Sequence, residues 1–78
     1  MRIADLAKGE RARISSIEAI SPELDAKLRE IGFCEGDEVE LVARGPFGGQ
    51  PLAVRLNRRI IAIRGEEASA IIVDLTGE

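Results

Sequence analysis

Hydrophobic residues in this 78-residue chain stand in short runs that are broken by charged residues and glycines. The longest uninterrupted apolar runs have four residues, 60–63 and 70–73, whereas a membrane-spanning helix needs about 20. Elsewhere apolar and polar residues alternate, as in 11–17 and 38–44, which is typical of strands with one buried and one solvated face. The pattern predicts a small, mainly β fold and no direct membrane insertion.

One segment instead has helical periodicity. Its apolar residues lie at i, i+4 and i+7 and form a single stripe: Leu24, Leu28 and Ile31. Ser21 is suited to cap the N-terminus, and Pro22 is suited to the first helical position. We therefore expect one α-helix over about 22–31, ended by Gly32.

The remaining segments predict a β meander around this helix. The expected strands are 11–17, 38–44, 52–56, 60–64 and 70–75. The expected connections are a seven-residue loop at 45–51, a hairpin turn at 57–59, and single helical turns at 3–7 and 66–68. Five short strands with a helix inserted after the first predict a single domain over 1–78, folded as a small, partly open barrel.

Composition limits the chemistry available to such a domain. The chain has no histidine and one cysteine, Cys34, so it cannot form an internal disulfide, and a zinc or haem site within one chain is not expected. The net charge of −3 and the presence of only two aromatic residues argue against a nucleic-acid binder. We predict no catalytic residue, cofactor or metal ligand, and the N-terminus without a secretion signal is typical of a cytosolic protein.

Charge is distributed unevenly along the chain. Residues 43–65 contain five arginines and no acidic residue, whereas 66–78 contain four acidic residues and no basic one. The arginines are Arg44, Arg55, Arg58, Arg59 and Arg64. They can hold carboxylates or phosphates of a partner, or they can pair with acidic residues of neighbouring segments. Those acidic residues are Glu38, Glu40, Glu66 and Glu67. Because surface ion pairs are common and weak, charge alone favours intramolecular pairing.

Three further features receive structural interpretations. Glu66 and Glu67 point in different directions on one helical turn, so we expect solvated charge rather than a hydrolytic pair. Cys34 follows a helix C-terminus and has no activating histidine, which predicts an unreactive, half-buried residue. The Gly48-Gly49 pair lacks the lysine and the following helix of a phosphate-binding loop, and we expect it to let a wide hairpin turn.

Three short motifs, in this order, resemble those of a known family. They are Leu28, Ile31-Gly32-Phe33, Gly36 and Val39; then Pro46-Phe47-Gly48-Gly49-Gln50-Pro51; then Ile63-Arg64 followed by Glu67-Ala68. They are similar to motifs of the FeoA family of bacterial ferrous-iron uptake, although Gln50 stands where that family usually has aspartate. The resemblance spans nearly the whole chain and implies an SH3-like barrel. The same domain occurs at the C-terminus of diphtheria-toxin-repressor-type metal regulators.

The resemblance implies a non-enzymatic cytosolic accessory protein that contacts the cytosolic part of the FeoB transporter. The protein would reach the inner face of the membrane only through this partner, and the start at Met1 favours a free-standing protein over a regulator domain. We predict that the contact surface includes Phe47, Arg55, Arg58 and Arg59, because an exposed aromatic residue beside arginines has the composition of protein interfaces.

A second hypothesis, of a different class, is a metal-sensing or regulatory SH3-like domain. It would bind Fe(II) or Mn(II) through carboxylates, since oxygen ligands suit such cations. The candidate ligands are Glu23, Asp25, Glu66 and Glu67. Anaerobic calorimetry with Fe(II) distinguishes the two hypotheses, because only the second predicts heat at sub-millimolar metal.

Overall fold

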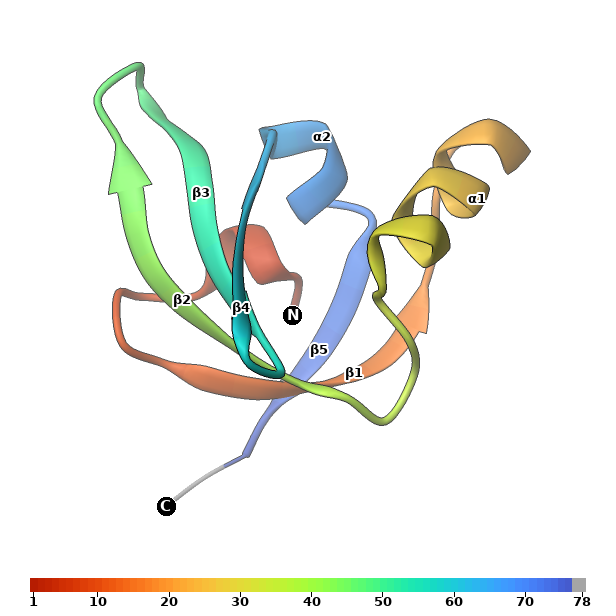
Figure 1. Cartoon of the computed structure of the whole chain (residues 1–78), viewed down its shortest axis with the longest axis horizontal. Coiled ribbons are helices and arrows are strands. Elements are labelled where there is room, and N and C mark those ends of the chain that lie inside the picture. Colours follow the sequence, from red (N-terminus) through yellow and green to blue (C-terminus); the bar gives the residue numbers. More distant parts are fainter. Residues whose placement is uncertain (77–78) are drawn as a thin grey trace.

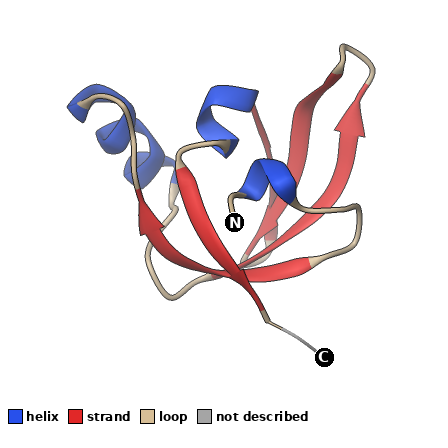
Figure 2. Ribbon diagram, turned by 180° about the vertical axis from the view of Figure 1, so that it is seen from behind, coloured by secondary structure: helices blue, strands red, loops and turns tan. Residues whose placement is uncertain are grey.

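A computed structural model of the chain describes residues 1–76 as one five-stranded antiparallel sheet with helices around it. The elements are a 3-10 turn η1 (Ile3–Asp5), β1 (Arg11–Ile17), α1 (Pro22–Ile31), β2 (Glu38–Gly45), β3 (Gly49–Leu56), β4 (Arg59–Ile63), α2 (Gly65–Ala68) and β5 (Ile71–Leu75). The strand order is β4-β3-β2-β1-β5, and the sheet is strongly curved (Figure 1). It is not closed, because β4 and β5 are its two edges (Figure 2). The mainly β, partly open architecture is as predicted.

Irregular pairing lets the short strands bend around one core. The β1–β5 register shifts between Ile14 and Ser16, and the β2–β3 register shifts between Leu41 and Ala43. An extra residue of this kind bends a strand and increases its twist. Buried aliphatic side chains then come from every strand: Ala12, Ile14, Val39, Leu41, Leu52, Val54, Leu56, Ile63, Ile71 and Val73. Their common environment is the concave side of the sheet.

The predicted α-helix is confirmed as α1. Ser21 Oγ accepts a hydrogen bond from the Leu24 N–H at 3.1 Å, and the Gly32 N–H donates to the Leu28 carbonyl at the other end. The Leu28 side chain is fully buried, and Phe33 is 1% exposed, so both fasten the helix to the core. No helix among the described residues is long and apolar enough to cross a membrane.

The prediction for the β2–β3 connection is wrong. The expected seven-residue loop over 45–51 is a three-residue turn, 46–48. Gly48 and Gly49 have φ angles of +66° and +88°, and such backbone conformations let the chain reverse within a short connection. Pro51, which has no N–H to donate, is tolerated in β3 because the pairing with β2 is irregular there.

The other elements lie within one or two residues of their expected bounds. The β3–β4 turn contains 57–58, and Asn57 has a φ of 59°, as two-residue hairpins require. β4 begins and ends one residue earlier than expected, and β5 begins one residue later. The helical turn expected at 3–7 is the shorter η1.

Candidate protein-interaction surface

The four residues predicted to contact a partner do not form one site. Phe47 lies in the β2–β3 turn, whereas Arg55, Arg58 and Arg59 lie toward the arginine turn (57–59) at the other end of β3 (Figure 1). At about 3.3 Å per residue along β3, the two turns are roughly 25 Å apart. The expectation that Phe47 sits beside the arginines is therefore wrong, because consecutive turns of a meander lie at opposite ends of the strand between them.

The hairpin tip, residues 46–48, presents an aromatic ring to solvent. Phe47 is 79% exposed, although its backbone is paired. The Phe47 N–H donates to the Gln50 carbonyl at 3.1 Å, and the Gln50 N–H donates to the Phe47 carbonyl at 3.2 Å. Gly45 lies so close beneath this pair that an added Cβ would come within 2.4 Å of the Gln50 carbonyl oxygen. The tip is therefore a tightly folded hairpin end.

Two side chains fasten the base of the hairpin tip to the rest of the molecule. Gln50 Oε1 accepts a hydrogen bond of 2.8 Å from the Gly65 N–H at the start of α2. Arg44 Nη2 donates to the carbonyls of Ala4, at 2.7 Å, and Leu6, at 2.9 Å. The hairpin is thus tied to α2 on one strand and to the N-terminal segment on the other. No local pattern predicted this role for Gln50, because its partner Gly65 is distant in the chain.

Two of the three arginines at this end of β3 are held by contacts within the molecule. Arg55 Nε lies 3.5 Å from Glu40 Oε1 on β2, which confirms the expected pairing between neighbouring strands. Arg59 Nη2 donates to the Ile31 carbonyl at 2.7 Å and so caps the C-terminus of α1. Arg58 is exposed, and its side chain makes no ion pair or hydrogen bond within the part of the chain that the structure describes.

The interpretation of Glu67 as solvated charge is wrong. Its side chain is only 5% exposed, and Oε2 lies 2.7 Å from Lys27 Nζ on α1. Oε1 accepts a hydrogen bond of 2.7 Å from the Arg64 N–H. Burial alone would raise the pKa of Glu67, but the bonds from Lys27 and Arg64 outweigh it, so the pKa is lowered from its usual value. The charged carboxylate therefore links α2 to α1.

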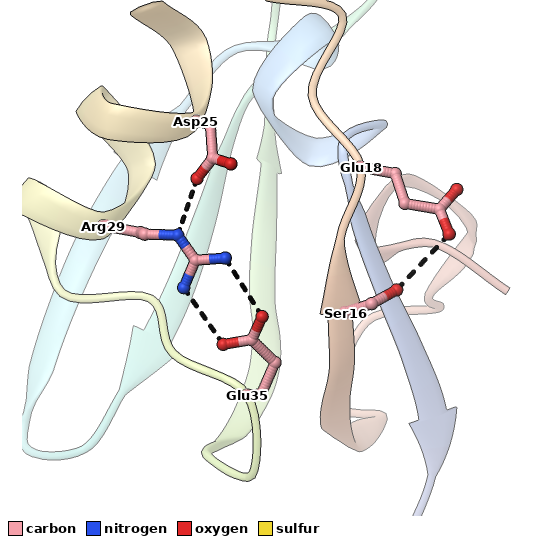
Figure 3. A network of polar contacts seen from close by, with 5 residues as sticks. All are labelled: Ser16, Glu18, Asp25, Arg29 and Glu35. Atoms are coloured by element: carbon pink, nitrogen blue, oxygen red, sulfur yellow. Dashed lines mark hydrogen bonds and ion pairs between the residues drawn. The ribbon is translucent and has the colours of Figure 1, made fainter. Parts of the chain in front are cut away.

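A second ion-pair network lies at the C-terminal end of α1 (Figure 3). Arg29 Nε donates to Asp25 Oδ1 at 2.6 Å, and its Nη1 and Nη2 donate to the two Glu35 carboxylate oxygens at 3.0 Å each. This bidentate contact lowers the pKa of Glu35 to about 2 and, with Asp25, raises that of Arg29. The adjacent Cys34 is exposed rather than half-buried as predicted, because Phe33 takes the buried position of this turn.

The four carboxylates of the metal-sensing hypothesis are not gathered into a site. Asp25 and Glu67 are held in ion pairs within the chain, and Glu23 and Glu66 are exposed. Among residues 1–76, no three side chains of the types His, Cys, Asp and Glu are grouped so that they could hold a metal ion. The structure therefore offers no observation in favour of this hypothesis.

A comparison with known protein families found a match over nearly the whole chain. Residues 1–75 match the FeoA domain. The chain belongs to the FeoA family. This membership confirms the resemblance carried by the three motifs and relates the FeoA domain described here to accessory proteins of iron transport. A search of curated proteins found no match.

Solved structures similar to this FeoA-family domain include two FeoA proteins. Stenotrophomonas maltophilia FeoA, solved with zinc and described as a procaryotic SH3 domain protein, is 36% identical, with a TM-score of 0.83 over 95% of this chain and 89% of that chain. Iron(II) transport protein A of Clostridium thermocellum is 37% identical, with a TM-score of 0.88 over 97% of this chain and 46% of that chain. A manganese-dependent transcriptional repressor, at 19% identity and a TM-score of 0.83 over 94% of this chain and 40% of that chain, shares the fold alone. The predicted SH3-like fold is confirmed.

Proposed function

We propose that this protein is a non-enzymatic accessory factor of bacterial ferrous-iron uptake that binds the cytosolic part of an FeoB-type transporter. The observation that carries the proposal is the match of residues 1–75 to the FeoA domain. Two similar structures support it, one named as iron(II) transport protein A and one described as a candidate activating factor of ferrous iron transport. The ferrous ion is the transporter's cargo, and the proposal gives it no ligand on this chain.

In this proposal, the protein acts in the cytosol and reaches the inner face of the membrane through its partner. Two of the four predicted contact residues, Phe47 and Arg58, are exposed, and the Arg58 side chain makes no hydrogen bond or ion pair within the described chain. Arg55 and Arg59 are held by contacts within the molecule. We therefore assign direct contact to Phe47 and Arg58, and we assign Arg55 and Arg59 the role of supporting the surface around the arginine turn.

Direct titration tests this proposal. The purified cytosolic region of the FeoB-type transporter from the same organism is titrated with the wild-type chain in a calorimeter, and saturable binding is expected. Arg58→Glu is compared with Lys8→Glu, which makes the same charge reversal at another exposed residue that has no ion pair in the described chain. Arg58→Glu should weaken binding roughly fivefold through the loss of charge complementarity, and Lys8→Glu should not. Absence of binding by the wild-type chain would contradict the proposal.

A further inference from the structure

We infer that the hairpin tip is a preformed anchor whose Phe47 ring enters an apolar pocket on a protein partner. The inference deepens the proposed function and depends on it for the identity of that partner. It rests on three features of the described residues: the exposure of the ring, the rigidity of the backbone that carries it, and the lack of charged residues within 45–51.

Phe47 is one of the two most exposed large hydrophobic residues among those described, together with Ile20. Phe47 and Phe33 are the chain's only aromatic residues, and they have opposite environments, since Phe33 is 1% exposed and Phe47 is 79% exposed. An aromatic side chain has a large area to bury, and at the hairpin tip that area stays in water. Phe47 therefore adds little to the stability of the isolated domain, and a partner would gain most of its hydrophobic contribution.

The backbone of the tip is fixed before any partner arrives. The hydrogen bonds between Phe47 and Gln50 close the turn, and Gly45 packs against them without space for a side chain. Gln50 Oε1 accepts a hydrogen bond from the Gly65 N–H, and Arg44 donates to two carbonyls of the N-terminal segment. Only the two side-chain torsions of Phe47 remain to be ordered on binding, which lowers the entropic cost of association.

The surroundings of the ring select the kind of partner. Residues 45–51 contain no charged side chain, so an uncharged, apolar pocket is complementary to the tip. A membrane surface is a poorer match, because the chain has a net charge of −3 and residues 46–48 contain no lysine or arginine to attract anionic lipid. Arg44, which lies beside Gly49, donates instead to two carbonyls of the N-terminal segment. A second copy is also a poorer match. Of two depressions on the described surface, one is lined mainly by charged residues, Arg11, Glu38, Glu40 and Arg55. The other places Arg13 and Asp74 beside Ile14, Ser15, Leu75 and Thr76, so neither is an uncharged pocket.

The decisive comparison uses the purified cytosolic region of the FeoB-type transporter and three variants of the full chain. Phe47→Ala removes the ring, Phe47→Leu keeps an apolar side chain, and Ile20→Ala truncates another exposed hydrophobic residue, 92% exposed and outside the tip. We expect Phe47→Ala to weaken binding by roughly 30-fold, as for a central anchor residue, Phe47→Leu to weaken it less, and Ile20→Ala to leave it unchanged. If Phe47→Ala binds as tightly as the wild type, the anchor is refuted while the proposed function stands.

A cellular readout separates the anchor from the identity of its partner. Wild-type, Phe47→Ala and Ile20→Ala chains are returned to a strain that lacks the protein, and ferrous-iron uptake is measured at equal protein levels. If the wild-type chain does not bind the transporter region but only Phe47→Ala fails to restore uptake, the proposed partner is wrong and the anchor is retained for another protein. Full restoration by Phe47→Ala overturns the anchor. Sedimentation at increasing concentration completes the test, because self-association that depends on Phe47 would overturn the choice of occupant.

Discussion

The two turns at opposite ends of β3 differ in what holds them and in what they leave free. The hairpin tip has an exposed aromatic ring, no charge, and hydrogen bonds that fix its backbone. At the arginine turn, Arg59 donates to the end of α1, and the neighbouring Arg55 is paired with Glu40. Exposure and charge are therefore not equivalent signs of a binding surface. A charged side chain can be used within its own fold, whereas an exposed ring at a fixed turn has its surface available to a partner.

The largest effect on stability is expected at the base of the hairpin tip, for Gly45→Ala. The new Cβ would come within 2.4 Å of the Gln50 carbonyl oxygen and 2.8 Å of Pro51 Cδ, so the backbone has to move. We expect the free energy of unfolding, measured by urea denaturation, to fall by about 2–3 kcal/mol. Gly65→Ala is the matched control, because the atoms nearest to its Cβ belong to the movable Gln50 side chain, at 3.1 Å, and a smaller loss is expected. Equal losses would show that the tip is not tightly constrained.

The second largest loss of stability is expected for a substitution of Glu67, which lies in α2, the helix to which the hairpin tip is bonded. Glu67→Gln removes the ion pair with Lys27 but keeps an oxygen to accept the Arg64 N–H. Because Lys27 is 56% exposed, solvent screens the pair, and the loss at pH 7 should be about 1–2 kcal/mol. No loss in thermal or urea unfolding would mean that the link between α1 and α2 contributes nothing to stability.

Glu67 also predicts a pH dependence. Its pKa is lowered on folding, so its charged form stabilises the folded state above the unfolded-state pKa of about 4.3. This contribution is lost as the pH falls below that value toward the folded-state pKa. A plot of unfolding free energy against pH should therefore be flatter below pH 5 for Glu67→Gln than for the wild type. Glu35→Gln is the comparison variant for this plot. It removes another carboxylate whose pKa is lowered, in this case by a separate contact of the exposed Glu35 with Arg29.

A smaller effect is expected within the arginine turn, and it separates two adjacent residues. Arg59→Ala leaves the Ile31 carbonyl at the end of α1 without its donor, so we expect a loss of about 1 kcal/mol in unfolding free energy. Arg58→Ala removes an exposed side chain that has no polar contact within the described chain, so its loss should stay below about 0.5 kcal/mol. A larger loss for Arg58→Ala than for Arg59→Ala would reverse their assigned roles.

The smallest effect on stability is expected for Phe47→Ala. Since the ring is 79% exposed, its removal should change the unfolding free energy by less than about 0.5 kcal/mol, while the affinity for the partner falls. A loss above about 1 kcal/mol would show that the ring packs within the molecule and would weaken its assignment as an anchor.

The sequence was sufficient for features that depend on nearby residues. Ser21 and Pro22 marked the start of α1, and the i, i+4, i+7 stripe correctly placed Leu28 against the core. The alternation of apolar and polar residues located β1 and β2, and short apolar segments bounded by turn residues located β3, β4 and β5. The topology also contained information that the residue-by-residue interpretation overlooked, since a meander places successive turns at opposite ends of a strand and so separates Phe47 from the arginine turn.

Contacts between distant segments could not be predicted in this way. The burial of Glu67 depends on Lys27, which lies on another helix, and no local pattern connects these two residues. The same is true of the bond between Arg59 and the Ile31 carbonyl. The short β2–β3 turn was missed for a different reason. Proline and glycine indicate a turn but do not give its length, which here depends on the irregular pairing of β2 with β3.

The claim that the hairpin tip is the main contact with the partner can be decided by nuclear magnetic resonance. Amide signals of the labelled chain are followed while the cytosolic region of the FeoB-type transporter is added. The largest shifts or line broadening should occur at residues 47–50 and at Gly65, with smaller changes at 57–59. Changes confined to α1 or to the arginine turn, with unaltered signals at 47–50, would contradict the claim.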